Sequence, residues 1–490
     1  MVASDRYKKF TLLHSNDMHG DFLAEAKDGD GTLVGGLAVL SGYLNEVRAV
    51  EKNVLYAIAG DMLQGSMIDS EYQGLSTFEI MNYLSPDVVT LGNHELDYGF
   101  RHLLFLEKIA SFPIINANLY IKQYKQRIFR PYIVLERDGF SIMFIGVVTD
   151  EVLASLKLDT TIADLISLED AAAEVGKVCN AYRNDDIDLT VLMTHIGFEQ
   201  DKLLAELLDP DWGVDIIIGG HSHTVLEQPA EVNGILIAQA AVGTDQIGRF
   251  DLTIDDDTNS VVEWKWELVP ITEDLCEPDR DLERFIATFK DEIDRTYSRI
   301  LSKLKRKLTH PQRETETEIG NLFADILVTA GRLDLVLLGS GSIRQPDLGP
   351  VVTLGDLSEI FTFDGPLSRV SITGERLLRV FAHAMRKENR VPGESNCFQV
   401  NHGVVAVYDE VAAKLVSLAI GGEPVDPARE YAVCLQDYTL SSCDTLLGLT
   451  TDELGPAKVI TTSARDVLNE FLTANQLADA VVEGRLVYQG

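Results

Sequence analysis

The sequence predicts an α/β protein with two domains joined by a long helix. Short apolar runs rich in Val, Ile and Leu alternate with helical patterns through the first half of the chain, and each run ends in a polar cluster that contains glycine. An amphipathic helical pattern follows over residues 279–308, and mixed strands and helices resume after it. A chain of 490 residues is long enough to bury a core in each domain.

The first domain is expected to cover residues 1–275 as sheets covered by helices. Its strand-like runs lie at 10–13, 54–59, 88–91, 189–193 and 214–218, and its clearest helical patterns lie at 36–50 and 168–182. Continuous apolar runs of this length are typical of strands that are buried on both faces. We therefore expect the polar clusters to lie at the ends of buried strands.

The helical pattern between the domains is predicted to form a connector helix over residues 279–310. Pro278 lies just before it and Pro311 just after it, at positions where proline readily begins and ends helices. The second domain is expected to cover residues 313–490 and to begin with a helix at 318–330.

Composition indicates an ordinary globular protein, with 46% hydrophobic and 24% charged residues. No apolar run approaches the ~20 residues of a membrane-spanning helix. Charged residues interrupt the first ten positions, unlike a signal peptide. The five cysteines form no Cys-x-x-Cys pair and are too sparse for a disulfide framework. We therefore expect a reduced, cytoplasmic setting and no association with a membrane.

The formal net charge of −35 argues against binding to nucleic acid or to an anionic membrane, because long-range repulsion would oppose the approach of polyanions. Small anions remain possible partners, since bound cations and a few arginines can reverse the sign of the potential inside a cleft. The expected partner is therefore a small anionic substrate. The oligomeric state stays open.

Seven residues in the polar clusters have the side chains of metal ligands. They are Asp17, His19, Asp61, Asn93, His195, His221 and His223. Imidazole, carboxylate and amide oxygen suit borderline divalent cations such as Mn, Zn, Fe or Co. A single Asp-x-His or Thr-His is a weak signal, but five such clusters, each after a strand, predict a site for two divalent metal ions. In such a site the two ions lie about 3.5–4 Å apart and share one carboxylate.

The segments Asp-x-His, Gly-Asp, Gly-Asn-His-Glu, Thr-His and Gly-His-Ser-His resemble those of the calcineurin-like metallophosphoesterases. The resemblance is to the 5′-nucleotidase branch, which includes periplasmic UDP-sugar hydrolases, and it extends over nearly the whole chain. We expect this chain to be a non-secreted member of that branch. It implies a four-layer αββα sandwich in the first domain and an α/β 5′-nucleotidase domain at the C-terminus. It also implies two ligand sets, Asp17, His19, Asp61 and His223 for one metal, and Asp61, Asn93, His195 and His221 for the other.

The same resemblance implies that His94 and Asp97 are the catalytic pair. An imidazole can stabilise charge on the phosphoryl group or protonate the leaving oxygen, and a nearby carboxylate can fix its orientation. The alternative for Asp97 is that it caps the turn at Tyr98 and Gly99. Glu95 is expected to be structural, and a role for His383 is left open.

The second domain is expected to bind the substrate. Arg344 follows the apolar run 335–338 through a glycine-rich turn, and a guanidinium can bind two phosphate oxygens at once. The alternative for Arg344 is a surface ion pair. By resemblance a further basic residue follows in a helix, for which Arg386 is preferred to Lys387 because only arginine offers the planar fork.

Nucleoside recognition in the family uses two aromatic rings and an aspartate. Tyr438 and Asp444 match the second ring and the aspartate, although Ser441 to Cys443 replace the expected glycine-rich turn. Phe398 is the candidate for the first ring by a one-residue shift, whereas direct alignment places Cys397 there. Stacking contributes about 1–3 kcal/mol per base. Core packing is the alternative for both Phe398 and Tyr438.

The resemblance implies hydrolysis of phosphomonoesters, with 5′-nucleotides converted to nucleosides and phosphate by a metal-activated hydroxide. A nucleotide-sugar diphosphatase or a 2′,3′-cyclic phosphodiesterase would share the metal centre and differ in the second domain. A nucleotide-binding scaffold without activity is the alternative outside catalysis. Retention of every expected ligand argues against it.

Overall fold

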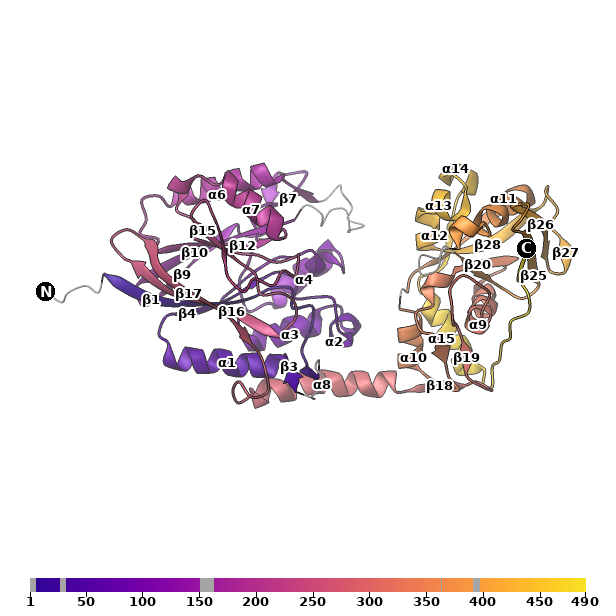
Figure 1. Cartoon of the computed structure of the whole chain (residues 1–490), viewed down its shortest axis with the longest axis horizontal. Helices are drawn as coiled ribbons and strands as arrows, with labels where there is room; N and C mark the ends of the chain where they lie inside the picture. The colour runs from indigo at the N-terminus through magenta and orange to yellow at the C-terminus, as the bar shows by residue number, and fades with distance from the viewer. Residues whose placement is uncertain (1–5, 27–31, 150–162, 363, 391–396) are drawn as a thin grey trace. The chain divides into compact units, whose positions relative to one another are not determined.

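The computed structural model describes residues 6–26, 32–149, 163–362, 364–390 and 397–490 (Figure 1). The chain divides into two compact units, residues 1–293 and 294–490. The boundary falls inside helix α8 (Arg280–Tyr297). Within the described ranges, no helix is both long enough and apolar enough to cross a membrane.

Two six-stranded sheets form the first unit. The first sheet has the order β17 (Ser260–Pro270), β16 (Gln246–Asp255), β1 (Tyr7–Ser15), β4 (Val54–Ala59), β5 (Val88–Thr90) and β6 (Ile114–Ile115). The second has the order β14 (Ala230–Val232), β15 (Ile235–Ala238), β13 (Ile216–Ile218), β12 (Leu189–His195), β10 (Phe140–Val148) and β9 (Tyr132–Arg137). Strands β1, β4, β5 and β6 are parallel to one another, as are β10, β12, β13 and β15.

Helices cover the outer face of each sheet. Figure 1 shows α6 (Leu168–Ala181) and α7 (Phe198–Leu207) over the second sheet, and α1 (Leu37–Val50) and α3 (Leu75–Leu84) over the first. A core between the sheets contains Phe10, Phe144 and Phe250, and a further core lies between the second sheet and α6 with α7. These layers confirm the predicted four-layer αββα sandwich.

The buried parallel strands follow directly from their sequences. All six residues of β4 and all seven of β12 are buried, as expected for strands that are covered on both faces. In parallel strands the carboxyl ends lie at the same edge of a sheet, where a crevice outside the strands can bind ligands. The polar clusters after β1, β4, β5, β12 and β13 are therefore placed where a site can form.

Smaller elements complete the first unit. They include α2 (Met67–Glu71), α4 (Phe100–Ile109) and the sheet of β11 (Ala163–Leu165), β7 (Leu119–Ile121) and β8 (Gln126–Arg127). Helix α8 begins after Asp279, whose Oδ1 accepts from the backbone N–H groups of Asp281 and Leu282 at 3.1 Å each. Its Phe285 packs against Tyr83 of α3 with a ring-centroid distance of 6.2 Å.

The predicted connector helix over 279–310 is too long. Helix α8 ends at Tyr297, and the chain continues as β18 (Ile300–Lys303) and β19 (Leu308–Thr309). Strand β18 pairs with β22 (Val351–Thr353), and Leu301, Leu304 and Leu308 are buried in a core of the second unit. The apolar spacing of this segment fits a continued helix and also fits two short strands, so contacts with the second unit decide which structure forms.

The second unit contains a five-stranded and a four-stranded sheet. The larger has the order β24 (Phe398–Val400), β20 (Leu335–Gly339), β28 (Glu430–Gln436), β23 (Leu367–Thr373) and β29 (Lys458–Thr461), and the smaller has β27 (Glu423–Pro424), β26 (Lys414–Ile420), β25 (Val404–Asp409) and β30 (Leu486–Gln489). Helices α9 (Glu318–Leu327) and α15 (Ala464–Ala474) share one core with the larger sheet, and α11 (Gly374–Ala384) shares the other. Short helices follow at α10 (Leu354–Ile360), α12 (Asp437–Ser441), α13 (Cys443–Leu447) and α14 (Thr451–Leu454).

Replacing Phe144 by alanine should destabilise the first unit by about 3–5 kcal/mol, because the ring is fully buried between the two sheets. Phe105→Ala is the matched control, since that ring on α4 is 52% exposed and its loss should change stability by less than about 0.5 kcal/mol. All three tryptophans (Trp212, Trp264 and Trp266) lie in the first unit, so tryptophan fluorescence during urea unfolding reports on it. Equal urea midpoints for the two variants would contradict the described core.

Candidate metal centre

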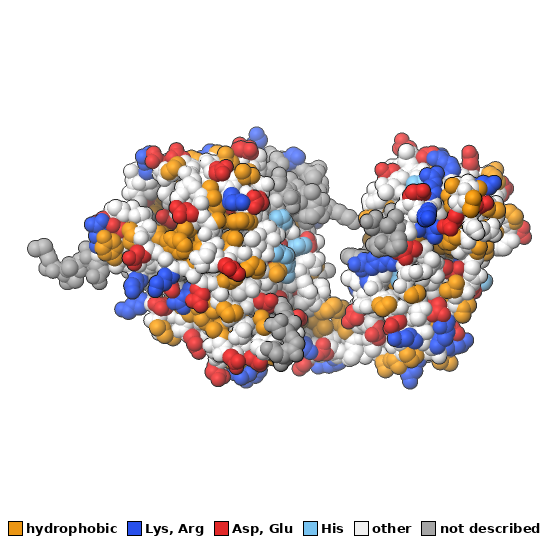
Figure 2. Space-filling model, in the orientation of Figure 1, with side chains coloured by type: hydrophobic (Ala, Val, Ile, Leu, Met, Phe, Trp, Pro, Cys, Tyr) orange, Lys and Arg blue, Asp and Glu red, His pale blue; other side chains and the backbone are white. Residues whose placement is uncertain are grey.

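The structure brings all seven predicted metal ligands together at the carboxyl ends of the parallel strands. Asp17 and His19 follow β1, Asp61 follows β4, Asn93 follows β5, His195 ends β12, and His221 and His223 follow β13. Figure 2 shows histidine side chains gathered in one place on the surface of the first unit. Loops from both sheets therefore contribute to a single site.

The first cluster consists of Asp17, His19 and His223, whose potential ligand atoms all lie within 4.8 Å of one another. The Nε2 atoms of His19 and His223 are 3.0 Å apart. His223 Nε2 is 3.3 Å from Asp17 Oδ1. One carboxylate and two imidazoles therefore converge on a common position.

The second cluster consists of Asp61, His195 and His221, which meet the same 4.8 Å limit. His195 Nε2 is 3.1 Å from Asp61 Oδ2. Asn93 Oδ1 joins this cluster at 2.8 Å from His221 Nδ1 and 3.2 Å from His195 Nε2. Asp61 Oδ2 also lies 3.9 Å from His19 Nε2, so its carboxylate adjoins both clusters.

Backbone carbonyls fix the tautomers of two histidines. The Nδ1 atom of His19 is 3.1 Å from the Leu63 carbonyl oxygen, and Nδ1 of His195 is 2.8 Å from the Ala59 carbonyl oxygen. A carbonyl can only accept, so each Nδ1 carries a proton, and in the neutral ring each Nε2 turns a lone pair toward its cluster. Neutral imidazoles together with carboxylate and amide oxygens fit divalent cations such as Mn, Zn, Fe or Co.

Charge balance inside the site favours an ionised Asp61. Burial disfavours the charged carboxylate, but in the metal-free site a protonated His195 ring outweighs burial through its charge and its hydrogen bond, and it holds the pKa of Asp61 below its usual range. The His94 backbone N–H also donates to Asp61 Oδ1 at 2.9 Å. An ionised carboxylate between two imidazole clusters is the arrangement that a shared ligand for two cations requires.

Five of the seven predicted ligands have left-handed backbone conformations. The φ angles are 50° for Asp17, 48° for His19, 52° for Asp61, 78° for His221 and 51° for His223. Each such conformation costs about 1–3 kcal/mol for a residue other than glycine. Strain of this kind persists where surrounding contacts enforce it, and here it turns the five side chains into the site.

Glycines allow the ligand loops to approach one another closely. A Cβ on Gly92 would lie 2.2 Å from Asp61 Oδ1, and one on Gly60 or Gly220 would lie 2.7 or 2.6 Å from His195 Nδ1. Any larger residue at these positions would therefore displace a predicted ligand.

Glu95 links the loops after β4 and β5. Its carboxylate accepts backbone N–H groups from Gly92 at 2.5 Å, Met62 at 2.7 Å and Asp61 at 3.0 Å, and its side chain is buried. Burial and the Asp61 charge raise the pKa of Glu95 to about 7, whereas the N–H donors favour its ionised form. The sequence predicts only a structural role for Glu95, and its place inside the Gly-Asn-His-Glu segment is the one signal of its closeness to the site.

His94 and Asp97 form the predicted pair beside these clusters. His94 Nδ1 lies 2.6 Å from Asp97 Oδ2, and the hydrogen bond to Asp97 raises the pKa of His94 above its ordinary value. The His94 and His19 ring centroids are 5.3 Å apart. The geometry therefore suits an imidazole that is oriented by a carboxylate next to the ligands.

The other substrate candidates lie on the surface of the second unit. Arg344 follows the short 3₁₀ helix Ser340–Ser342, and Arg386 follows α11, both with exposed side chains. Tyr438 on α12 is 71% exposed. Asp444 on α13 is exposed and accepts from the Thr445 backbone N–H at 2.8 Å. His383 Nε2 is 2.8 Å from the Thr445 carbonyl oxygen, so this histidine ties α11 to α13.

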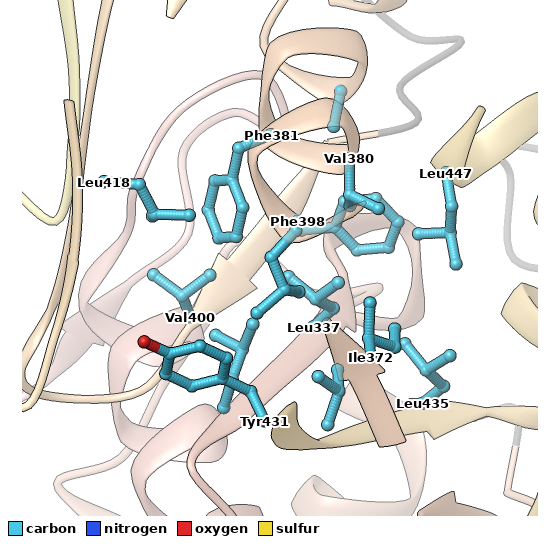
Figure 3. Close-up of a cluster of buried hydrophobic side chains, with 14 of the residues drawn as sticks. Leu337, Ile372, Val380, Phe381, Phe398, Val400, Leu418, Tyr431, Leu435 and Leu447 are labelled. Atoms are coloured by element: carbon cyan, nitrogen blue, oxygen red, sulfur yellow. The ribbon is translucent and has the colours of Figure 1, made fainter. Parts of the chain in front are cut away.

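The structure contradicts the expectation that Phe398 offers a stacking face. Its ring is only 6% exposed and packs against the core of the second unit, among Leu337, Val380 and Phe381 (Figure 3). Alternation along β24 places Phe398 and Val400 on the same buried face, which sequence alone does not reveal. Cys397, the direct alignment position, is buried as well, with Sγ 3.5 Å from the Glu314 carbonyl oxygen.

Comparison with known families divides the chain in the same way as the structure. The model of the calcineurin-like phosphoesterase family matches residues 10–225. The model of the 5′-nucleotidase C-terminal domain matches residues 293–450. The first range contains all seven predicted ligands and the His94–Asp97 pair.

Known relatives extend over most of the chain. Endonuclease YhcR of Bacillus subtilis is 28% identical over 464 residues, which cover 89% of this chain but only 37% of that protein. The 5′-nucleotidase of Mus musculus is 25% identical over 544 residues, covering 98% of this chain and 90% of that protein. The crystal structure of a 5′-nucleotidase precursor from Thermus thermophilus shares the fold, with a TM-score of 0.63 and 22% identity over 98% of this chain and 99% of that chain.

Replacing Glu95 by glutamine should weaken the binding of divalent cations by about 10- to 100-fold. The glutamine NH2 group would face backbone N–H donors that the carboxylate now accepts, and the backbone of Asp61 would lose this support. Titration of the metal-free protein with Co²⁺ measures the change. Glu174→Gln is the matched control, since Glu174 is also buried in the first unit but pairs with Arg127 and Lys177. Equal Co²⁺ affinities for the two variants would contradict the assigned role of Glu95.

Proposed function

Because the chain belongs to the calcineurin-like phosphoesterases that carry a 5′-nucleotidase C-terminal domain, we propose that it hydrolyses 5′-nucleotides to nucleosides and inorganic phosphate. The chain is a metal-dependent hydrolase of phosphoric esters. The observation that carries the proposal is the pair of ligand clusters that adjoin Asp61, with the His94–Asp97 pair beside them. The similarity to the mouse 5′-nucleotidase over 98% of this chain supports the choice of substrate.

The proposed ligand sets follow the two clusters. Asp17, His19, Asp61 and His223 would hold one cation, and Asp61, Asn93, His195 and His221 the other. Two divalent cations held in this way would activate water and neutralise charge on the phosphoryl oxygens. The carbonyl contacts of His19 and His195 keep their Nε2 atoms ready for this role.

The proposed role of His94 is to hold a proton near the leaving oxygen. Asp97 accepts from the Nδ1 side of the ring and raises the pKa of His94, so that the protonated form persists to higher pH than in a free histidine. A proton donor of this kind stabilises the alkoxide that leaves when the phosphoester bond breaks. Asp97 would orient the ring without touching substrate.

The proposed nucleoside contacts come from the second unit. Arg344 and Arg386 would bind phosphate oxygens through their planar guanidinium groups. The exposed ring of Tyr438 would stack on the base, and Asp444 would accept from ribose hydroxyls. With Phe398 and Cys397 both buried, stacking on Tyr438 alone would distinguish poorly between bases.

A phosphodiesterase is the second candidate, because one relative carries the name Endonuclease YhcR. That similarity spans only 37% of the other protein's length, and the net charge of −35 opposes the approach of nucleic acid. Small diesters, such as 2′,3′-cyclic nucleotides, and nucleotide-sugar diphosphates escape this second objection. They are therefore the alternatives that an assay must include.

Purified protein supplied with Mn²⁺, Zn²⁺ or Co²⁺ should release phosphate from AMP faster than it cleaves UDP-glucose, 2′,3′-cyclic AMP or bis-p-nitrophenyl phosphate. The family and the mouse relative favour the monoester, whereas the metal centre alone would serve all four. Turnover confined to the two diesters would overturn the nucleotidase assignment.

Two variants separate chemistry from nucleoside binding. His94→Ala should lower kcat by about 10²- to 10⁴-fold on AMP, whose departing ribose alkoxide needs a proton, and by less on p-nitrophenyl phosphate, whose nitrophenolate leaves readily without one. Tyr438→Ala should raise KM for AMP by about 5- to 150-fold and leave p-nitrophenyl phosphate unaffected, since only AMP carries a base. Tyr124→Ala is the control for loss of an exposed ring, as Tyr124 is 68% exposed in the first unit. A Tyr438→Ala variant that loses both activities equally would contradict this division of roles.

A further inference from the structure

A set of polar side chains lies behind the loops that carry His195, His221 and His223. We call the set of Thr194, Asp201, Ser222 and Gln239 the polar bridge. Thr194, Asp201 and Gln239 are completely buried; Thr194 lies in β12, Asp201 lies in α7, and Gln239 is the residue after β15. None of the four is among the predicted ligands.

The first arm of the polar bridge connects to the loop of His195. Thr194 immediately precedes His195, and its hydroxyl donates to Asp201 Oδ1 at 2.6 Å. The same hydroxyl oxygen is 3.3 Å from the carbonyl oxygen of Ile218, the last residue of β13. Asp201 therefore contacts the end of β12 at the point where that strand delivers a predicted ligand.

The second arm connects to the loop of His221 and His223. Gln239 Oε1 accepts from the Ser222 hydroxyl at 3.1 Å and from the Thr224 backbone N–H at 2.7 Å. The Ser222 hydroxyl oxygen in turn accepts from the backbone N–H of Phe198 at 3.0 Å, where α7 begins. Gln239 thus holds the residues on either side of His223.

The two arms face each other across Gly219. Among the described residues, Asp201 Oδ2 and Gln239 Nε2 are buried and have no hydrogen-bond partner. They lie 2.2 and 3.6 Å from the position that a Cβ on Gly219 would take. A carboxylate oxygen accepts and an amide nitrogen donates, so the two groups are complementary across the space that glycine leaves.

Burying these atoms is unfavourable for stability alone. An unsatisfied buried donor or acceptor costs about 1–3 kcal/mol, and apolar side chains of the same shape would avoid that cost. Burial also raises the pKa of Asp201 to about 7. The presence of polar groups that weaken the fold here is explained if they fix the geometry of the neighbouring ligands.

We propose that Asp201 and Gln239 are positioning residues of the metal centre, which hold the loop of His195 in register with the loop of His221 and His223. They act through Thr194, Ser222 and the Thr224 backbone without touching a cation. The inference rests on the metal centre and is independent of which phosphoester is the substrate.

The test compares Asp201→Leu with the unaltered protein. Leucine has a similar branched shape and removes the unpartnered Oδ2, and the Thr194 hydroxyl keeps the Ile218 carbonyl as an acceptor, so the urea midpoint of the metal-free variant should change little. Its Co²⁺ affinity should fall by about 10-fold or more, and the visible spectrum of bound Co²⁺ should change because the ligand geometry changes. Asp201→Asn should retain both properties, since its Oδ1 can accept from the Thr194 hydroxyl as the carboxylate does.

Asp215→Leu is the matched control. Asp215 accepts from the Thr190 backbone N–H at 2.9 Å, at the ends of β12 and β13 that are opposite to the metal centre. The Asp215→Leu variant should therefore bind Co²⁺ with unaltered affinity and spectrum. An Asp201→Leu variant with unaltered Co²⁺ affinity and spectrum would overturn the proposal, as would an equal loss in Asp215→Leu or in Asp201→Asn. If Asp201→Leu does not fold, Gln239→Met decides by the same two Co²⁺ measurements.

Discussion

The site depends on Asp61, a buried carboxylate held in a left-handed conformation between two clusters of imidazoles. Its φ of 52° turns the side chain back from the end of β4, and its Oδ2 then lies 3.1 Å from His195 Nε2 and 3.9 Å from His19 Nε2. One side chain can adjoin both clusters only because loops from the two sheets end at the same edge. The sandwich therefore serves to bring strand ends from both sheets to this carboxylate.

Such a conformation needs support, which the surrounding residues provide. Glu95 accepts the Asp61 backbone N–H, and Gly92 leaves room for the carboxylate that its own Cβ would otherwise displace. The polar bridge ties together the loops that carry three histidines. Buried groups that are unfavourable for stability thus surround the ligands, as expected where geometry matters more than stability.

Much of the first unit could be predicted from sequence because its signals are local. A buried strand shows as a run of Val, Ile and Leu, and a ligand such as Asp61 or His195 follows it directly. The predicted connector is too long because residues 300–308 fit both a helical face and short strands, and only their burial in the second unit decides between them.

The remaining differences concern contacts between residues far apart in the chain. Phe398 lies next to Cys397 in sequence, and only the pairing of β24 reveals that its ring enters the core. Asp201 and Gln239 are single polar residues near apolar segments, and nothing in their neighbours shows that they face each other across Gly219. Glu95 belongs to a recognisable motif, but the sequence does not show that its carboxylate accepts from the backbone of both ligand loops.

The number of metal ions bound per chain tests most directly whether two cations share Asp61. Equilibrium dialysis against Co²⁺ followed by elemental analysis should find two ions per chain in the unaltered protein. Because Asp61 adjoins both clusters, Asp61→Ala should lose tight binding of both ions. Asp251→Ala, on β16 opposite Thr11 of β1, should keep both, since Asp251 is not one of the predicted ligands. One ion in the unaltered protein, or one retained at full affinity in Asp61→Ala, would contradict a shared centre.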